Sequence, residues 1–206
     1  MNHQDRVRNG RKIKTNMGNF RNSRTEGESA GKMYKYIEYR SPVGKIIICS
    51  YGDALTALFF EGQKYADRYT DRYLRGKYCP EGNPVLDRTL AWLDRYFAGE
   101  RPDPSEIRLA PEGTPFQRQV WDELLKIPYG TTDTYGAIAR RLHSGSQAVG
   151  GAVGRNPISI IIPCHRVLGA DGSLTGYAAG LAVREKLLEI EGCMLTRRQT
   201  SWFTWK

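Results

Sequence analysis

The sequence lacks the long apolar runs that mark membrane and secreted proteins. No stretch of its 206 residues approaches the roughly 20 consecutive apolar residues that span a bilayer. The first thirty residues are basic but contain no apolar core, which argues against a secretory signal. Only four cysteines are present and none belongs to a Cys-x-x-Cys pair, so reduced thiols are indicated and a disulfide framework is not. We therefore expect a cytoplasmic protein with no membrane contact.

The chain has fewer acidic than basic residues: 22 Asp and Glu against 31 Lys and Arg, which gives a net charge of +9. More than half of this excess lies in residues 1–32, which also lack periodic apolar residues. Such a composition buries too little surface to offset chain entropy, so a disordered basic tail is expected. The alternative is that this N-terminal segment has no functional role. Positive charge suits a nucleic acid partner, but charge alone does not decide the question.

Residues 33–110 show the pattern of a small α+β domain. Two turns, Ser41–Gly44 and Gly52–Asp53, separate three short alternating or β-branched stretches and predict a three-strand meander. Asn83 and Pro84 then begin a segment whose apolar residues recur at helical spacing until Gly99.

A Pro-rich stretch without periodicity, residues 101–115, separates this domain from a second one at residues 111–195. Short helices are predicted here, the first capped by Thr114, the second by Thr134 and the third by Ser144 or Ser146. The second and third resemble a helix-turn-helix, and the third is poor in large side chains. Its glycines permit close approach either to a partner or merely to a neighbouring helix. Residues 196–206 form a C-terminal tail.

A Cys-His pair, Cys164 and His165, ends an apolar, β-branched segment. The thiolate is the reactive form of cysteine, and a partly buried thiol needs a nearby base or positive charge to ionise. His165 is a candidate base, acting directly or through a water, and Glu191 on the predicted last helix is a candidate to orient it. On this interpretation the pKa of Cys164 lies below the value of about 8.5 for a free thiol. The alternative is a buried structural cysteine beside an incidental histidine.

The pair belongs to a longer string with further matches along the chain. Pro163-Cys-His-Arg-Val167 is preceded by Gly154-Arg-Asn-Pro157 and followed by Gly176-Tyr177 and Gly180-Leu-Ala182. Further strings are Ala148–Ala152, Thr134-Tyr135, Pro115–Gln117, Phe60–Gln63 and Ser41–Gly44. Together they resemble the O6-alkylguanine-DNA alkyltransferase family over all of the chain except its two tails.

This resemblance implies an α+β protein with a small ribonuclease-H-like N-terminal domain, followed by a winged-helix-like helix-turn-helix domain that binds the DNA minor groove. It implies a direct, single-turnover transfer of an alkyl group from O6 of guanine in double-stranded DNA to the protein's own cysteine. We expect a monomer with no cofactor and no metal. The zinc site of some family members has no evident ligands here, because the first 48 residues offer His3 and no cysteine.

The resemblance also implies roles for individual residues. The catalytic set is the acceptor Cys164, the water-linked base His165, the orienting carboxylate Glu191, and Asn156, which braces the active-site turn. The substrate-binding set is Tyr135 at guanine N3, the carbonyls of Val167 and Cys164 at the guanine amino group, the backbone N–H of Ala178 at O6, and Tyr177.

The expected DNA-binding residues are Gln147, Ala148, Ala152 and Arg155. Small side chains on this helix suit a narrow groove that carries little sequence information. Gln147 departs from the family pattern, in which an arginine at this position intercalates where the flipped nucleotide was.

Three alternatives from other classes stay open at this point. A non-catalytic reader of alkylguanine shares the fold but lacks the acceptor cysteine. A cysteine hydrolase built on Cys164, His165 and Glu191 turns over. A winged-helix regulator has no need of Cys164 and binds a specific DNA sequence.

Overall fold

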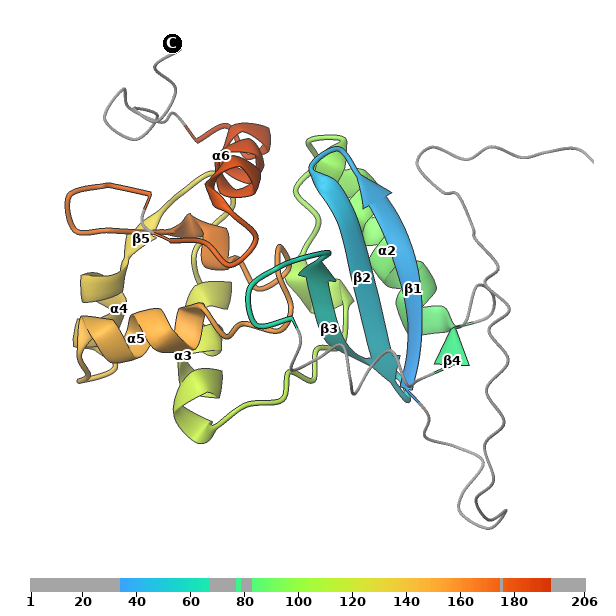
Figure 1. The fold of residues 1–206 in the computed structure, drawn as a ribbon, viewed down its shortest axis with the longest axis horizontal. Coiled ribbons are helices and arrows are strands. Elements are labelled where there is room, and N and C mark those ends of the chain that lie inside the picture. The colour runs from blue at the N-terminus through green and yellow to red at the C-terminus, as the bar shows by residue number, and fades with distance from the viewer. Residues whose placement is uncertain (1–33, 67–76, 79–82, 175, 194–206) are drawn as a thin grey trace, which may run out of the picture.

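The computed structural model describes residues 34–66, 77–78, 83–174 and 176–193 (Figure 1). The two expected tails, residues 1–32 and 196–206, lie outside these ranges. The elements are β1 (Tyr34–Ser41), β2 (Gly44–Tyr51), β3 (Ala54–Phe60), β4 (Lys77–Tyr78), α2 (Pro84–Phe97), η1 (Pro104–Glu106), α3 (Pro115–Leu125), β5 (Asp133–Thr134), α4 (Tyr135–Arg141), α5 (Ser146–Val153), η2 (Cys164–Arg166), β6 (Val167–Leu168) and α6 (Leu181–Ile190).

The N-terminal part is a sheet of order β3-β2-β1-β4 with α2 packed against one face. The predicted meander β1-β2-β3 is confirmed, and Gly52 adopts a φ of 60° in its second turn, where a side chain is disfavoured. Helix α2 begins at Pro84, as predicted, and Asn83 caps it, because the Oδ1 of Asn83 accepts from the N–H of Val85 at 3.0 Å. Its Nδ2 also donates to Ser50 Oγ at 2.9 Å, which fixes the start of the helix to β2.

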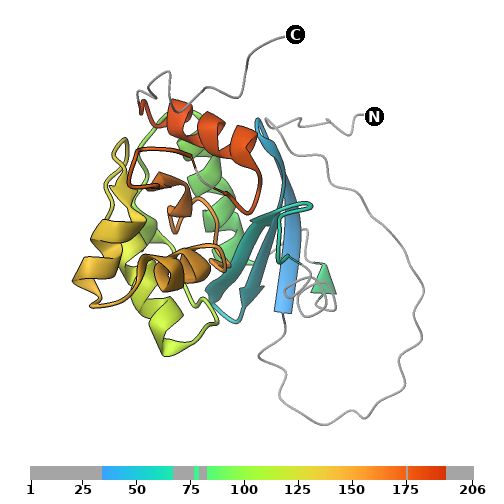
Figure 2. The same ribbon diagram turned by 60° about the vertical axis from the view of Figure 1, so that its left-hand side comes forward.

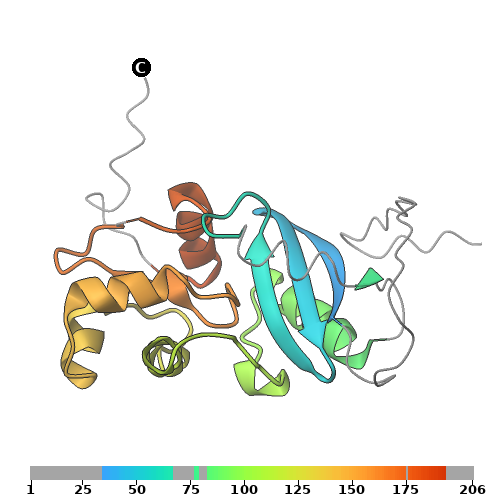
Figure 3. The ribbon, with the colours of Figure 1, turned by 60° about the horizontal axis from the view of Figure 1, so that its bottom comes forward.

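Edge strand β3 joins the two parts of the chain. Leu55 exchanges backbone hydrogen bonds with Arg108 and Ala110, both at 2.8 Å. Leu58 likewise accepts from Ser159 at 2.7 Å and donates to Pro157 at 2.9 Å. These bonds satisfy groups that an exposed edge strand leaves open, and Figures 2 and 3 show the C-terminal helices beside this edge. The sheet thus fixes the segment that leads to Cys164.

The helix starts of the C-terminal part follow from local sequence in two of three cases. Thr114 forms a capping box with Gln117 at the start of α3, and Thr134 Oγ1 accepts from Ala137 N–H at 3.1 Å at the start of α4. The prediction that Ser144 or Ser146 caps the next helix is wrong, since Gly145 occupies the cap position without a side-chain bond. The turn after α4 is closed by the bond from Ser144 N–H to Ala139 O, and it leaves Gly145 as the residue that precedes the first helical residue, Ser146.

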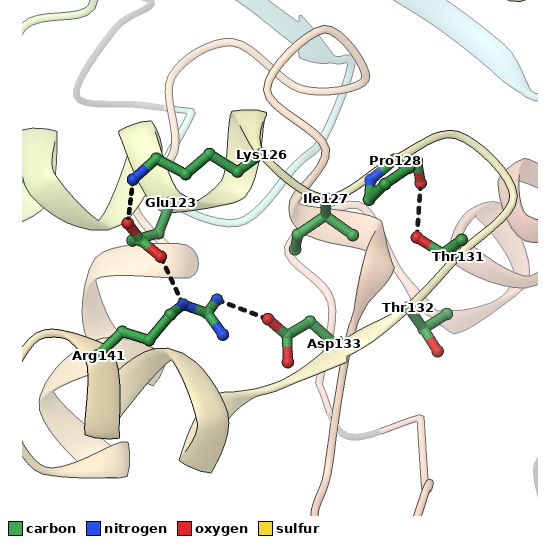
Figure 4. A pocket seen from close by; sticks show the side chains of 8 residues that line it. All are labelled: Glu123, Lys126, Ile127, Pro128, Thr131, Thr132, Asp133 and Arg141. Atoms are coloured by element: carbon green, nitrogen blue, oxygen red, sulfur yellow. Dashed lines mark hydrogen bonds and ion pairs between the residues drawn. The ribbon is translucent and has the colours of Figure 1, made fainter.

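An ion-pair cluster clamps α3, β5 and α4 together at the base of the helix-turn-helix (Figure 4). Arg141 donates through Nε to Glu123 Oε2 at 2.5 Å and through Nη2 to Asp133 Oδ2 at 2.6 Å. Lys126 reaches the other oxygen of Glu123. Hydrogen bonds from Lys126 and Arg141 outweigh burial and lower the pKa of Glu123. The clamp therefore holds α4 against α3 only while this carboxylate is ionised.

We predict that Glu123→Gln lowers the free energy of unfolding by about 1 kcal/mol at pH 7, a modest figure because both cations are largely exposed. A carboxyl whose pKa falls on folding stabilises the fold above its unfolded pKa, and this contribution disappears as pH falls through the folded pKa. Urea denaturation should thus show the gap between variant and wild type closing as the pH falls below the value of about 4.3 for an unperturbed glutamate. Glu100→Gln, which removes an exposed carboxylate, is the control, and a gap independent of pH contradicts the prediction.

Candidate active site

The turn that precedes Cys164 is held by Asn156. The Oδ1 of Asn156 accepts from Ile158 N–H at 3.0 Å, and its Nδ2 donates to Ile162 O at 2.8 Å. Between these two contacts Ile160 has a φ of 70°, which is unfavourable for a β-branched residue. Such strain persists only where surrounding contacts over-determine the backbone, and the two-sided grip of Asn156 does so.

Cys164 lies at the start of η2 and lines a small, partly open cavity of about 40 Å³. Its side chain is nearly buried, and Sγ lies 3.9 Å from Tyr177 Oη. Four other residues expected in the site, Tyr135, Asn156, Tyr177 and Ala178, line the same cavity. Val167 is not among the lining residues; its side chain is buried in β6, and its expected contact is made by the backbone carbonyl. The remaining lining residues are Gln63, Gly150, Val153, Gly154 and Gly176.

Behind the cysteine, His165 and Glu191 form a buried pair. The Nε2 of His165 lies 2.7 Å from Glu191 Oε1, and Arg166 grips the same carboxylate through Nε at 2.8 Å and Nη2 at 2.9 Å. Burial alone would raise the pKa of Glu191, but the bonds and charges of His165 and Arg166 lower it to about 2. An ionised carboxylate can only accept hydrogen bonds, so the ring proton of His165 sits on Nε2.

This tautomer leaves Nδ1 of His165 with a lone pair. Burial lowers the pKa of His165 despite the neighbouring Glu191, so the imidazole is neutral at pH 7. Within the described part of the chain Nδ1 is buried and makes no hydrogen bond. His165 is thereby equipped as a base that Glu191 orients from behind.

The expected low pKa of the Cys164 thiol is wrong. Burial raises this pKa, and opposing contributions from Asn156, Tyr177 and Arg184 do not overcome it. Loss of solvation penalises a thiolate more than the neighbouring donors stabilise it. The resting cysteine is therefore a thiol that needs a base at the moment of reaction, which makes Nδ1 of His165 more important.

Helix α5 presents only part of the expected DNA-binding set. Gln147 and Ala148 are exposed in its first turn. Ala152 is 3% exposed and packs in the core, so its expected place at the DNA surface is wrong. The reason is that α3 lies against this face, where Trp121 Nε1 donates to Ala152 O at 3.0 Å. Arg155 is half-buried, with Nη1 donating to Gly151 O at 3.0 Å.

Three residues near the site were missed from sequence. Gln63, in the turn after β3, lines the cavity, and its Oε1 accepts from Ser159 Oγ at 3.1 Å. Arg184 is fully buried on α6 and donates through Nε to His165 O at 3.0 Å. Tyr96 on α2 donates to Glu191 at 2.8 Å. Gln63 belongs to a family-like string, but nothing local in the sequence places these three residues near the site.

Two other kinds of site are not found among the described residues. No helix there is both long and apolar enough to cross a bilayer. No three His, Cys, Asp or Glu side chains in that part of the chain gather as metal ligands would.

Comparison with known proteins places both halves of the chain. Residues 34–111 match the ribonuclease-like domain of 6-O-methylguanine DNA methyltransferase, and residues 115–193 match its DNA-binding domain. The methylated-DNA–protein-cysteine methyltransferase of Methanosarcina mazei is 52% identical over 161 residues, covering 77% of this chain and 97% of that protein. The Haemophilus influenzae protein of the same name is 44% identical over 159 residues, covering 76% and 85%.

Solved structures agree with these matches. The crystal structure of Mycobacterium tuberculosis O6-methylguanine methyltransferase superimposes with a TM-score of 0.63 at 40% identity, covering 78% of this chain and 92% of that one. Mycobacterium tuberculosis OGT in complex with DNA gives a TM-score of 0.63 at 40% identity, covering 77% and 91%. The α+β fold, with a small sheet domain before a helical DNA-binding domain, is thus confirmed. The chain belongs to the 6-O-methylguanine DNA methyltransferase family, the methylated-DNA–protein-cysteine methyltransferases.

Proposed function

We propose that Cys164 accepts the alkyl group from O6 of a guanine that has been rotated out of double-stranded DNA into the cavity. Membership of the family makes the chain a DNA-binding protein that repairs DNA by direct alkyl transfer to its own cysteine. The observation that carries the assignment to Cys164 is the neutral imidazole of His165, held by ionised Glu191, on the residue that follows a buried thiol in the cavity wall.

The transfer follows from these parts. The Sγ proton passes to Nδ1 of His165, directly or through a water, while sulfur attacks the alkyl carbon and the bond from carbon to O6 breaks. Guanine leaves with developing negative charge, which the backbone N–H of Ala178 and the hydroxyl of Tyr135 stabilise as it forms. The imidazolium that results is stabilised by Glu191, and its proton finally neutralises the guanine anion. The thioether has no leaving group, so each protein molecule reacts once.

The approach to the lesion is from the minor groove. O6 is inaccessible inside a duplex, and rotating the nucleotide out costs roughly a few kcal/mol. The exposed first turn of α5, with Gln147 and Ala148, is small enough to enter the narrow groove. One cavity and one recognition helix per chain are sufficient for this reaction, so a monomer is proposed as the active unit.

A non-catalytic reader of alkylguanine is the second candidate, because it needs the same pocket and helix. His165 and Glu191 form a buried proton relay behind Cys164. This relay favours the transferase, because a protein that only binds alkylguanine needs no base. Incubation with a duplex containing O6-methylguanine, followed by intact-protein mass measurement, separates the candidates. A transferase gains one methyl group per molecule and stops, a hydrolase turns over without a mass change, and a reader or regulator binds without reacting.

Gln147 leads to a prediction about lesion search. Arginine in its place adds a planar cation that stacks in the vacated position and neutralises phosphate potential. We expect Gln147→Arg to tighten duplex binding and to speed repair of methylated duplex, with little effect on free O6-benzylguanine, which needs no extrusion. The measured quantity is the ratio of the two rate gains.

The matched control is Gln119→Arg, which adds the same charge at an exposed position on α3. If both substrates respond equally to Gln147→Arg, or if the duplex reaction slows, Gln147 does not lie at the intercalating position.

A further inference from the structure

The proton relay receives a donor from the N-terminal domain. Tyr96, near the end of α2, donates its hydroxyl to Oε1 of Glu191 at 2.8 Å across 95 positions of sequence. The same oxygen faces His165 Nε2 at 2.7 Å and Arg166 Nη2 at 2.9 Å. Oε2 accepts from Arg166 Nε at 2.8 Å and from Gly130 N–H at 3.3 Å. The carboxylate is therefore held on all sides, and one of its fixed donors comes from outside the active-site domain.

The ring of Tyr96 is fixed by packing. It stacks on Trp92 with centroids 5.5 Å apart and meets Phe97 and Tyr129 edge-on at 5.2 Å and 6.1 Å. The side chain is fully buried. Burial and the negative charge of Glu191 raise the pKa of Tyr96 well above its usual value, so the phenol stays protonated and acts as a donor. A rigid ring with a permanent O–H is suited to positioning, because no rotamer or proton must change during the reaction.

On the side of Glu191 opposite Tyr96, the loop that contains Gly130 packs tightly against the end of α6. Gly130 has a φ of 75°, and a Cβ there would lie 2.9 Å from the backbone oxygen of Glu191. The loop can therefore approach the end of α6 only with glycine at this position. Glu191 sits between this loop and Tyr96 and has little freedom to rotate.

We propose that Tyr96 is a positioning residue for alkyl transfer: its hydroxyl holds Oε1 of Glu191 in line with His165 Nε2 and so couples the N-terminal domain to the relay. The inference rests on the proposed function of His165 and Glu191. It gives the N-terminal domain a part in the chemistry, beyond supporting the fold. Tyr96 does not line the cavity beside Cys164, and its hydroxyl is directed to Glu191, so it acts through that carboxylate.

Loss of the Tyr96 hydroxyl should change the pKa of His165 in a direction that electrostatics defines. Without the Tyr96 hydroxyl, Oε1 carries more negative charge toward Nε2, which stabilises the imidazolium and raises the pKa of His165. The rate of transfer requires neutral His165, so the acidic limb of its pH profile moves to higher pH. The other charged or titratable groups near the pair are unchanged by the substitution: Arg101, Tyr129, Arg166, Tyr177, Arg184 and Cys193.

The test is Tyr96→Phe in the full chain, which keeps the ring and removes only the hydroxyl. We expect methyl transfer from duplex to slow about tenfold on the pH plateau, less than the roughly 10²- to 10⁴-fold that a general base itself contributes, with the acidic limb displaced to higher pH. Binding of lesion duplex, compared between Cys164→Ser and Cys164→Ser/Tyr96→Phe, should not change. Nitrogen NMR of the ring of His165, one of only three histidines, should show the higher pKa without any DNA present.

Tyr39→Phe is the matched control, since Tyr39 is buried in the same aromatic cluster and donates to Asp94 at 2.9 Å, away from the relay. It should match Tyr96→Phe in melting temperature to within a few degrees and react like wild type. Wild-type kinetics and an unshifted His165 resonance in Tyr96→Phe overturn the proposal. So does slower transfer with an unchanged pH profile, because that result indicates a purely structural role. The NMR reading stands even if Cys164 proves not to be the acceptor.

Discussion

Cys164→Ser is expected to reduce methyl transfer by several orders of magnitude, to below detection, because a hydroxyl is a far weaker nucleophile than a thiol at neutral pH. Serine is close to cysteine in size, and the cavity wall and α5 are left intact. Binding to duplex with O6-methylguanine should therefore stay within about twofold of wild type, which corresponds to a change of about 0.4 kcal/mol in binding free energy. Single-turnover transfer assays and fluorescence anisotropy on the same duplex measure the two quantities.

The control for this result is Cys193→Ser. Cys193 is half-buried after α6, outside the cavity, and should be dispensable for transfer. Full activity of Cys164→Ser contradicts the account of the site, and so does loss of activity in Cys193→Ser with the fold retained.

His165→Gln has the second largest expected effect. The glutamine amide can still donate to Glu191, so the buried pair of Glu191 with Arg166 survives, but no basic nitrogen remains. We expect transfer to slow by about 10²- to 10³-fold, the usual contribution of a general base. Comparing the transfer rates of His165→Gln and Tyr96→Phe then separates the loss of the base from the loss of a residue that positions it.

The pH dependence sharpens this prediction. Burial lowers the pKa of His165 and raises that of Cys164, so the wild-type rate should level off above the pKa of His165. In His165→Gln only spontaneous ionisation of the thiol remains, and the rate should rise about tenfold per pH unit through neutrality. A flat profile in the variant would mean that His165 is not the base.

Glu191→Gln is a less selective probe of the same relay. Arg166 is 7% exposed and its guanidinium relies on Glu191 for its counter-charge. Removing one partner of a buried pair costs about 3–5 kcal/mol, so this variant should lose stability as well as activity.

Local patterns predicted the elements that are fixed by local contacts. The meander, the start of α2 and the caps at Thr114 and Thr134 each depend on residues within a few positions of one another, and all four are confirmed. The predicted cap of α5 was wrong because the turn after α4 places Gly145 before the first helical residue, and the helix pattern does not encode the length of that turn.

The sequence predicted the active site only in part. The resemblance brought Glu191 to His165, and the structure places them 2.7 Å apart. Ala152 was misplaced because the position of α3 decides which face of α5 is buried. The thiol pKa was misjudged because the sequence shows donors near Cys164 but not how completely the thiol is buried. Such quantities depend on packing between distant segments.

The central claim concerns the destination of the alkyl group, and peptide mass mapping tests it most directly. The wild-type protein is incubated with a duplex that carries one O6-methylguanine, digested and sequenced by mass spectrometry. The account predicts one methyl group per molecule, on the peptide that contains Cys164, with the duplex returned to unmodified guanine. Methyl on Cys49, Cys79 or Cys193, or repaired DNA with no added mass on the protein, would contradict it.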